Sequence, residues 1–130
     1  MTVCVDASAV VSLFDENDPN HKRAKKLASK LVSVERIVSN FVFAEIVTIL
    51  SQKIGKQASI DAGNYLNHEF TMIRLDPEIE NSAWEIFKKQ TSKNVSFVDC
   101  TIIALYKDGA FDKVFTFDTD FKKNKVAVLE

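Results

Sequence analysis

Short apolar runs rich in β-branched residues alternate along this chain with longer segments in which apolar residues recur at helical spacing. The strand-like runs cover residues 2–6, 35–40, 70–75, 113–117 and 125–129. The helix-like segments cover residues 7–14, 19–34, 41–54, 57–69, 77–87 and 97–109, and a short turn or helix follows residue 118. Strands separated by helices predict a mostly parallel, five-stranded sheet covered on both faces, which is the α/β class.

Capping residues predict where two of these helices begin. Asp18 followed by Pro19 is typical of an N-cap with proline at the first helical position, so we expect a helix to start there. Ser39 or Asn40 can cap the helix that follows the second strand. These signals support the division of the chain into alternating strands and helices.

Composition narrows the class of protein. A chain of 130 residues that is 46% hydrophobic, with only 3 Gly and 2 Pro, predicts one compact domain over residues 1–130. No apolar run reaches the roughly 18 residues of a membrane-spanning helix, and the N-terminus lacks the features of a signal peptide. We therefore expect a cytoplasmic protein without a membrane partner. Cys4 and Cys100 lack metal-ligand spacing, which favours buried, reduced thiols.

The charge pattern gives a mixed indication about nucleic acids. A formal net charge of -1 argues against a protein that coats nucleic acid without specificity. Basic residues nevertheless gather in two segments, 22–30 and 122–125. The first is interpreted mainly as the solvated face of a helix, although flanking lysines can also hold phosphates.

Four acidic residues lie within apolar sequence: Asp6, Glu45, Asp99 and Asp118. Burying an unpaired carboxylate costs several kcal/mol, roughly, so these groups need compensation. Asp6 and Asp118 follow strands, and ligands of parallel sheets bind beyond the carboxyl ends of strands. If the fold brings the four acids together, a hard divalent cation such as Mg²⁺ or Mn²⁺ is the expected compensation.

Each acid also has a purely structural interpretation. Asp6 can cap the helix after the first strand, and Asp99 can form a capping box with Ser96; for both residues the two interpretations carry equal weight. Glu45 is harder to explain as structural, because its neighbours at helical spacing form a largely apolar face. For Asp120 we favour a capping or solvated role.

The motifs VCVDASAVVSLF, SNFVFAEIVTIL, SFVDCTIIAL and FTFDTDF, in this order and over nearly the whole chain, resemble the PIN domain ribonucleases, and among them the VapC-type toxins of toxin–antitoxin pairs. The resemblance implies a three-layer α/β/α fold with a five-stranded sheet. It implies a metal-dependent endoribonuclease that uses one or two Mg²⁺ or Mn²⁺ ions. The implied partners are an RNA substrate and a small antitoxin protein.

The resemblance also assigns roles to residues. The catalytic and metal-binding acids would be Asp6, Glu45, Asp99 and Asp118, with Asp120 as an additional, variable ligand. Ser8 and Thr116 match positions where the family often carries a hydroxyl near the metal.

Apolar residues beyond what one small core can bury favour a homodimer, an assembly common among similar proteins. They are Phe41, Val42, Phe43, Ile79 and Trp84.

Other functions fit less well. A haloacid dehalogenase-type phosphatase needs a second Asp two residues after the first, and this position is Ser8. A receiver domain does not account for the late acid Asp118. The stronger alternative is an RNA-binding or scaffold protein that keeps the PIN fold without nuclease activity, although acids at all four positions count against it.

Overall fold

A computed structural model describes all residues, 1–130, and contains one four-stranded sheet. The strands are β1 (Thr2–Val5), β2 (Glu35–Ser39), β3 (Thr71–Ile73) and β4 (Lys113–Phe115). All three pairings are parallel, and the strand order is β3-β2-β1-β4. The central strands β1 and β2 therefore place their carboxyl ends side by side, with β4 next to β1.

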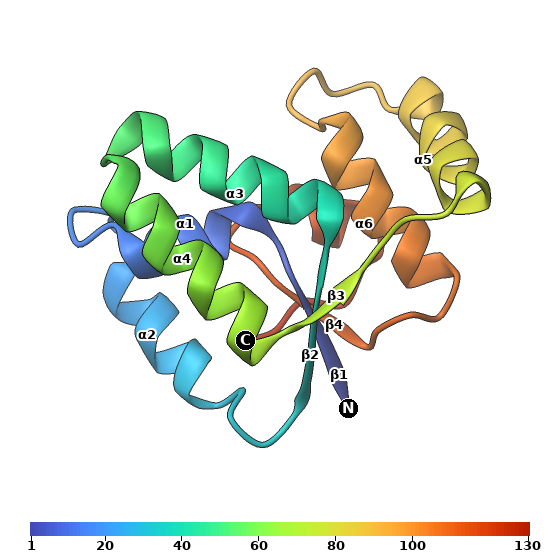
Figure 1. Ribbon diagram of the computed structural model, residues 1–130. Coiled ribbons are helices and arrows are strands. Elements are labelled where there is room, and N and C mark those ends of the chain that lie inside the picture. The colour runs from blue at the N-terminus through green and yellow to red at the C-terminus, as the bar shows by residue number, and fades with distance from the viewer.

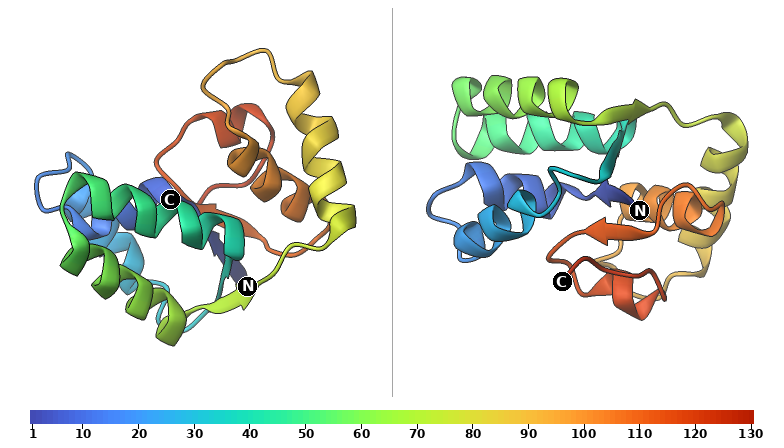
Figure 2. Two further views of the ribbon diagram at one scale, coloured as in Figure 1. Left: turned by 45° about the horizontal axis from the view of Figure 1, so that its top comes forward. Right: turned by 90° about the horizontal axis from the view of Figure 1, so that it is seen from below.

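Helices lie on both sides of this sheet (Figure 1). The first group contains α1 (Ala7–Phe14), α2 (His21–Ser29), α3 (Asn40–Lys53) and α4 (Lys56–Glu69). The second contains α5 (Pro77–Lys89) and α6 (Phe97–Lys107), while the short α7 (Asp120–Lys123) follows β4. Figure 2 shows α3 and α4 side by side, and α3 also contacts α6, so this contact joins the two groups near the strand ends.

The prediction of a fifth strand over residues 125–129 is wrong. This segment forms only an isolated parallel bridge between Val128 and Val114. Val114 donates its amide to the Ala127 carbonyl at 2.9 Å, and the Leu129 amide donates to the Val114 carbonyl at 2.9 Å. Two conditions limit further pairing: β4 offers only three residues, and Lys125 at the start of the segment has φ 63, outside the extended region.

The predicted start of the second helix is also wrong, because α2 begins at His21 rather than at Pro19. The Asp18 carboxylate instead accepts hydrogen bonds from the Asn20 amide at 2.8 Å and from the Ser12 hydroxyl at 3.0 Å. Asp18 thus closes a turn after α1 and does not cap a helix. The cap at Ser39 is confirmed, since its hydroxyl accepts from the Val42 amide at 3.1 Å.

The main core lies between the sheet and the helices that cover it. β1 and β2 supply fully buried residues to it, and Ile46, Leu50 and Leu66 supply apolar side chains from α3 and α4. Cys4 belongs to this core, and Cys100 belongs to a smaller cluster between α5 and α6; both are free thiols, as predicted. None of the helices is long and apolar enough to cross a membrane.

The apolar residues singled out for a dimer do not all reach the surface. Val42 is fully buried, whereas the Trp84 side chain on α5 is 52% exposed. Trp84 stacks on Phe87 at 5.7 Å and contacts Phe97 at 6.2 Å, measured between ring centroids. Of the five residues, Trp84 is the one that is exposed, and it belongs to an aromatic cluster on α5 and the start of α6.

Candidate functional site

A cavity of about 530 Å³ lies at the carboxyl ends of β1 and β4 and is bordered by α1, α3 and α6. Its wall includes Asp6, Glu45, Asp99 and Asp118, so one cavity receives all four acids that the sequence placed in apolar surroundings. Two of these acids follow strands and two lie near the start of helices. The parallel sheet brings them together, because its adjacent strands end at the same edge.

Asp6 is the most buried of the four, with only 3% of the residue exposed. It occupies the N-cap position of α1 but makes no side-chain capping bond, which excludes the purely structural interpretation as a cap. Its Oδ2 instead accepts hydrogen bonds from the Thr116 hydroxyl at 2.7 Å and the Ser8 hydroxyl at 2.8 Å. Both bonds use the same oxygen, which leaves the lone pairs of Oδ1 for another partner.

Thr116 and Ser8 connect Asp6 to the segment after β4. The Thr116 hydroxyl lies 3.1 Å from the Ser8 hydroxyl and accepts from the Asp118 amide at 3.0 Å. The Ser8 hydroxyl accepts from the Phe117 amide at 3.0 Å. This network fixes the backbone from which the Asp118 side chain enters the cavity.

Asp118 and Asp120 occupy different places. Asp118 lines the cavity, and its Oδ1 accepts from the Asp120 amide at 2.9 Å. Asp120 is the first residue of α7, does not line this cavity, and places a carboxylate oxygen 3.9 Å from the Lys123 ammonium. The structure therefore separates the two acids of FDTDF, with Asp118 toward the cavity.

Glu45 lies in the second turn of α3 and is half-buried. Loss of hydration on burial, followed by repulsion from Asp6 and Asp99, raises its pKa from 4.5 to about 7. A glutamate in this position is only partly ionised at neutral pH unless a cation compensates its charge.

Asp99 takes part in the capping box of α6 and also lines the cavity. The Ser96 hydroxyl accepts from the Asp99 amide at 3.0 Å, and the Asp99 Oδ2 accepts from the Ser96 amide at 3.0 Å, so the predicted capping box is present. Asp99 also lines the cavity, where burial and repulsion from Asp6 and Asp118 raise its pKa to about 6. The cap holds one carboxylate oxygen, and the other remains available to the cavity.

The donor set fits a hard divalent cation. Burial raises the pKa of Asp6 and of Asp118 as well, so all four carboxyls hold protons more tightly here than in water. A cation bound among them reverses this effect, and carboxylate oxygens are the ligands that Mg²⁺ and Mn²⁺ prefer. No three acidic, His or Cys side chains are spaced to enclose an ion by themselves.

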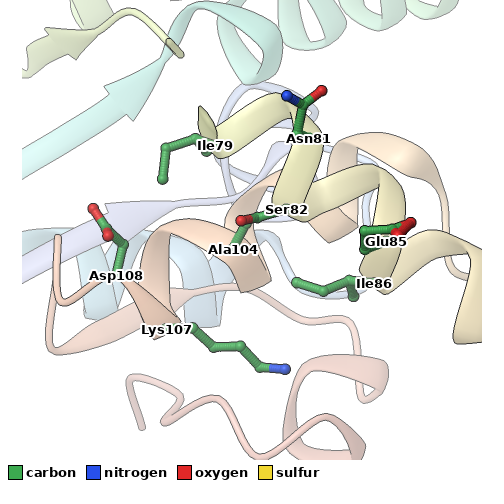
Figure 3. Close-up of a pocket in the computed structure, with 8 residues that line it drawn as sticks. All are labelled: Ile79, Asn81, Ser82, Glu85, Ile86, Ala104, Lys107 and Asp108. Atoms are coloured by element: carbon green, nitrogen blue, oxygen red, sulfur yellow. The ribbon is translucent and has the colours of Figure 1, made fainter. Parts of the chain in front are cut away.

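A second large cavity, about 480 Å³, lies between α5 and α6 (Figure 3). Its wall combines Ile79, Ser82 and Ile86 of α5 with Ala104 of α6, and none of the four clustered acids borders it. Its two acids are Glu85 on α5 and Asp108, the C-cap residue of α6. The four clustered acids therefore border the cavity at the strand ends and not the cavity between α5 and α6.

Several residues on the wall of the acidic cavity at the strand ends were not predicted from the sequence. Ser12, Asp18, Asn20, Asn94 and Phe117 also border it. The polar loop after α1 supplies two of them, and its position directly after the first strand–helix unit was the available signal. Nothing in the local sequence of Asn94 distinguishes it from an ordinary loop residue.

Comparison with known proteins identifies the family and the fold of the chain. The sequence model of the PIN domain matches residues 3–127. The chain is 31% identical over 123 residues to the 23S rRNA-specific endonuclease VapC20 of Mycobacterium tuberculosis, covering 92% of this chain and 91% of that protein. The crystal structure of VapC20, described as a Sarcin-Ricin loop cleaving toxin, superposes with a TM-score of 0.86 at 28% identity and covers 96% of both chains.

More distant structures share the fold. FitAcB from Neisseria gonorrhoeae gives a TM-score of 0.73 at 19% identity, covering 98% of this chain and 96% of the other. VapBC2 from Rickettsia felis, bound to a DNA fragment from its promoter, gives 0.67 at 15% identity, covering 100% and 98%. From the domain match over residues 3–127 and the VapC20 likeness, the chain belongs to the PIN domain family.

Proposed function

We propose that this protein is a metal-dependent endoribonuclease and the toxin of a type II toxin–antitoxin pair. One observation carries the proposal: four carboxyls with raised pKa values border the same open cavity at the carboxyl end of a parallel sheet. Such a site is poorly suited to bind RNA or to stay ionised on its own. It becomes suited to both when a divalent cation is bound.

In this proposal Asp6, Asp99 and Asp118 bind one or two Mg²⁺ or Mn²⁺ ions, directly or through water. The bound ion supplies an attacking hydroxide and neutralises charge on the phosphoryl oxygens and the leaving group. Glu45 binds the ion or orients the nucleophilic water. Ser8 and Thr116 hold Asp6 in place through its Oδ2, at 2.8 and 2.7 Å.

RNA is the proposed substrate because VapC20, which matches nearly the full length of this chain, is a 23S rRNA-specific endonuclease. Ribosomal RNA is therefore the first substrate to examine. The products expected from the family resemblance are 5′-phosphate and 3′-hydroxyl ends.

We further propose two protein partners. VapBC and FitAcB structures share this fold, and a small antitoxin that brings an Arg or Lys into the acidic cavity would replace the charge of the metal and exclude RNA.

A second copy of the chain is the other partner, and the exposed Trp84 with Phe87 and Phe97 supports an interface on α5 and α6. Sedimentation at tens of micromolar protein, roughly the concentration at which a modest association is visible, tests this interface. Detection of monomers alone would contradict the proposed homodimer.

The test is cleavage of purified ribosomal RNA across a Mg²⁺ and Mn²⁺ titration and in excess chelator. We expect cleavage only with a divalent cation, and we expect Asp6→Asn to abolish it. Asp61→Asn, which alters an exposed acid on α4, serves as the matched control and should cleave normally. Circular dichroism should show both variants folded.

Two results would contradict the proposal. A folded Asp6→Asn variant with normal cleavage would remove Asp6 from the site. RNA binding by the wild-type protein without cleavage in either metal would favour the alternative, a PIN-fold RNA-binding or scaffold protein.

A further inference from the structure

A smaller cavity of about 150 Å³ adjoins the acidic cavity and differs from it in charge. The two share Asn20, Phe117 and Asp118, so they lie next to each other. Arg23 of α2 and Lys122 of α7 border only the smaller cavity. The wall therefore changes from clustered carboxylates in the larger cavity to two cations beside Asp118 and Glu130 in the smaller one.

Arg23 is held at this position by an aromatic ring. Its guanidinium carbon lies 5.6 Å from the centroid of the Phe117 ring, a cation–π distance. The Phe117 amide donates to the Ser8 hydroxyl at 3.0 Å, and Ser8 donates to Asp6, so the ring that carries Arg23 is tied to the acid network. The planar guanidinium of arginine is the side chain best matched to two phosphate oxygens.

Lys122 is paired in the structure with a carboxylate. Its ammonium contacts the Glu130 side chain, which also borders the smaller cavity. The hydrogen bond from Lys122, together with the positive charges of Lys122 and Arg23, holds the pKa of Glu130 below its usual range. Both partners are more than half exposed, and exposed ion pairs of this kind contribute little stability. The Glu130 carboxylate thus marks a place that favours an anion, in a pairing that a phosphate can displace.

We propose that Arg23 and Lys122 form a phosphate-binding subsite for RNA, in which they hold a phosphate neighbouring the one at the acidic cavity while Glu130 competes for the same cations. This inference rests on the proposed function, since it assumes that RNA is the substrate of the adjoining acidic cavity. Arg23 and Lys122 are positioning residues: they place the RNA backbone beside the acidic cavity and take no part in bond cleavage. A backbone contact of this kind reads charge and not base sequence.

The test is the affinity of a fluorescently labelled, mixed-sequence, single-stranded RNA oligonucleotide with cleavage-resistant phosphorothioate linkages, measured by anisotropy over a series of salt concentrations at saturating Mg²⁺. The matched pair is Arg23→Gln and Lys25→Gln, which remove one positive charge each from the same helix. Lys25 is exposed and borders neither cavity, because two residues along a helix is more than half a turn. Both variants therefore change the net charge equally but only one changes the subsite.

We expect Arg23→Gln to weaken RNA binding several-fold and to reduce the slope of log affinity against log salt by about 0.7, the value for one lost phosphate contact to a single strand. Lys25→Gln should leave the slope unchanged, and Arg23→Lys should restore the slope but only part of the affinity, because lysine keeps the charge and lacks the planar guanidinium. Glu130→Gln should strengthen binding, because it frees Lys122. In cleavage assays with Mg²⁺, Arg23→Gln should raise KM with little change in kcat.

Equal slopes for Arg23→Gln and Lys25→Gln would overturn the subsite, because RNA would then sense only the overall field of the protein. Weaker binding by Glu130→Gln would overturn the competition by Glu130. If the wild-type protein neither binds nor cleaves RNA, the proposed function itself fails. Metal-dependent cleavage by the wild type beside an unchanged KM for Arg23→Gln would refute the subsite alone.

Discussion

At the scale of single residues, two hydroxyls hold the most buried acid of the site, because Ser8 and Thr116 both donate to Asp6. Sequence alone located the four acids, because carboxylates inside apolar runs need compensation. It could not show that Thr116, 4% exposed, donates to the same oxygen of Asp6 as Ser8 does, since Thr116 lies 110 positions from Asp6 along the chain. Only the family resemblance drew attention to these hydroxyls.

Thr116→Val tests this network with little change in volume. The substitution removes a hydroxyl that donates to Asp6 and leaves the Asp118 amide without its acceptor. We expect a loss of about 1–3 kcal/mol in the free energy of unfolding, and cleavage that requires more metal. Urea denaturation and a Mn²⁺ titration of cleavage measure the two effects. Thr116→Ser retains the hydroxyl and should behave much like the wild type; equal losses in both variants would show that the methyl group, not the hydroxyl, matters.

Asp118 and Asp120 should differ in importance. Asp118 borders the acidic cavity, whereas Asp120 begins α7 beside Lys123. We expect Asp118→Asn to lower RNA cleavage at least as much as Asp120→Asn and to weaken Mn²⁺ binding, while Asp120→Asn chiefly raises the metal concentration required. Calorimetry and single-turnover cleavage on the two variants decide this. An inactive Asp120 variant beside a nearly active Asp118 variant would reverse the assignment.

Protonation of Glu45 and Asp99 should control metal affinity. Their pKa values are raised to about 7 and about 6, and a cation must displace protons from groups that still hold them. We therefore expect Mn²⁺ affinity to increase as pH rises across this range. Calorimetry at several pH values measures it, and Glu45→Gln should flatten the upper part of the curve. A Mn²⁺ affinity independent of pH between about 5 and 8 would exclude both groups from the binding site.

At the scale of elements, α6 carries Asp99 in its first turn, and this acid lines the cavity and also completes the capping box with Ser96. The capping box was predictable from the spacing of Ser96 and Asp99, because cap and acceptor are local in sequence. The absence of the expected fifth strand was not predictable, because pairing with β4 depends on the length of β4 and on the backbone of Lys125. The start of α2 was missed for a similar reason: the Ser12 hydroxyl and the Asn20 amide occupy the Asp18 carboxylate that was expected to cap the helix.

Ser96→Ala separates the cap from the site. It removes the hydroxyl that accepts from the Asp99 amide but keeps the Ser96 amide that orients the Asp99 carboxylate. We expect the free energy of unfolding to fall by about 1 kcal/mol while cleavage at saturating metal stays close to normal. Chemical denaturation and a cleavage assay give the two numbers. Ser96→Asn, another good capping residue, should lose less stability. Loss of cleavage without loss of stability would mean that the Ser96 hydroxyl acts in the site itself.

At the scale of the whole molecule, the clustered acids should make stability depend on pH. Folding raises the pKa of Glu45 from 4.5 to about 7 and that of Asp99 from 3.8 to about 6. Between the lower and the upper value of each group, the folded state holds more protons than the unfolded state. Stability must then decrease as pH rises through this window. In chelator we expect a higher Tm at pH about 5 than at pH about 7.5, and saturating Mg²⁺ should raise the Tm at the higher pH. A Tm that increases with pH in chelator would contradict the raised pKa values.

Binding of Mn²⁺ to the metal-free protein at neutral pH, measured by calorimetry, shows whether the four clustered acids form a metal site. Wild type, Asp6→Asn and the exposed control Asp61→Asn should be compared in parallel. We expect the wild type and Asp61→Asn to bind one or two ions per chain with equal affinity, and Asp6→Asn to lose the tighter ion. Equal binding by all three proteins, or metal-independent RNA cleavage by a wild type that binds no ion, would contradict the proposed metal site.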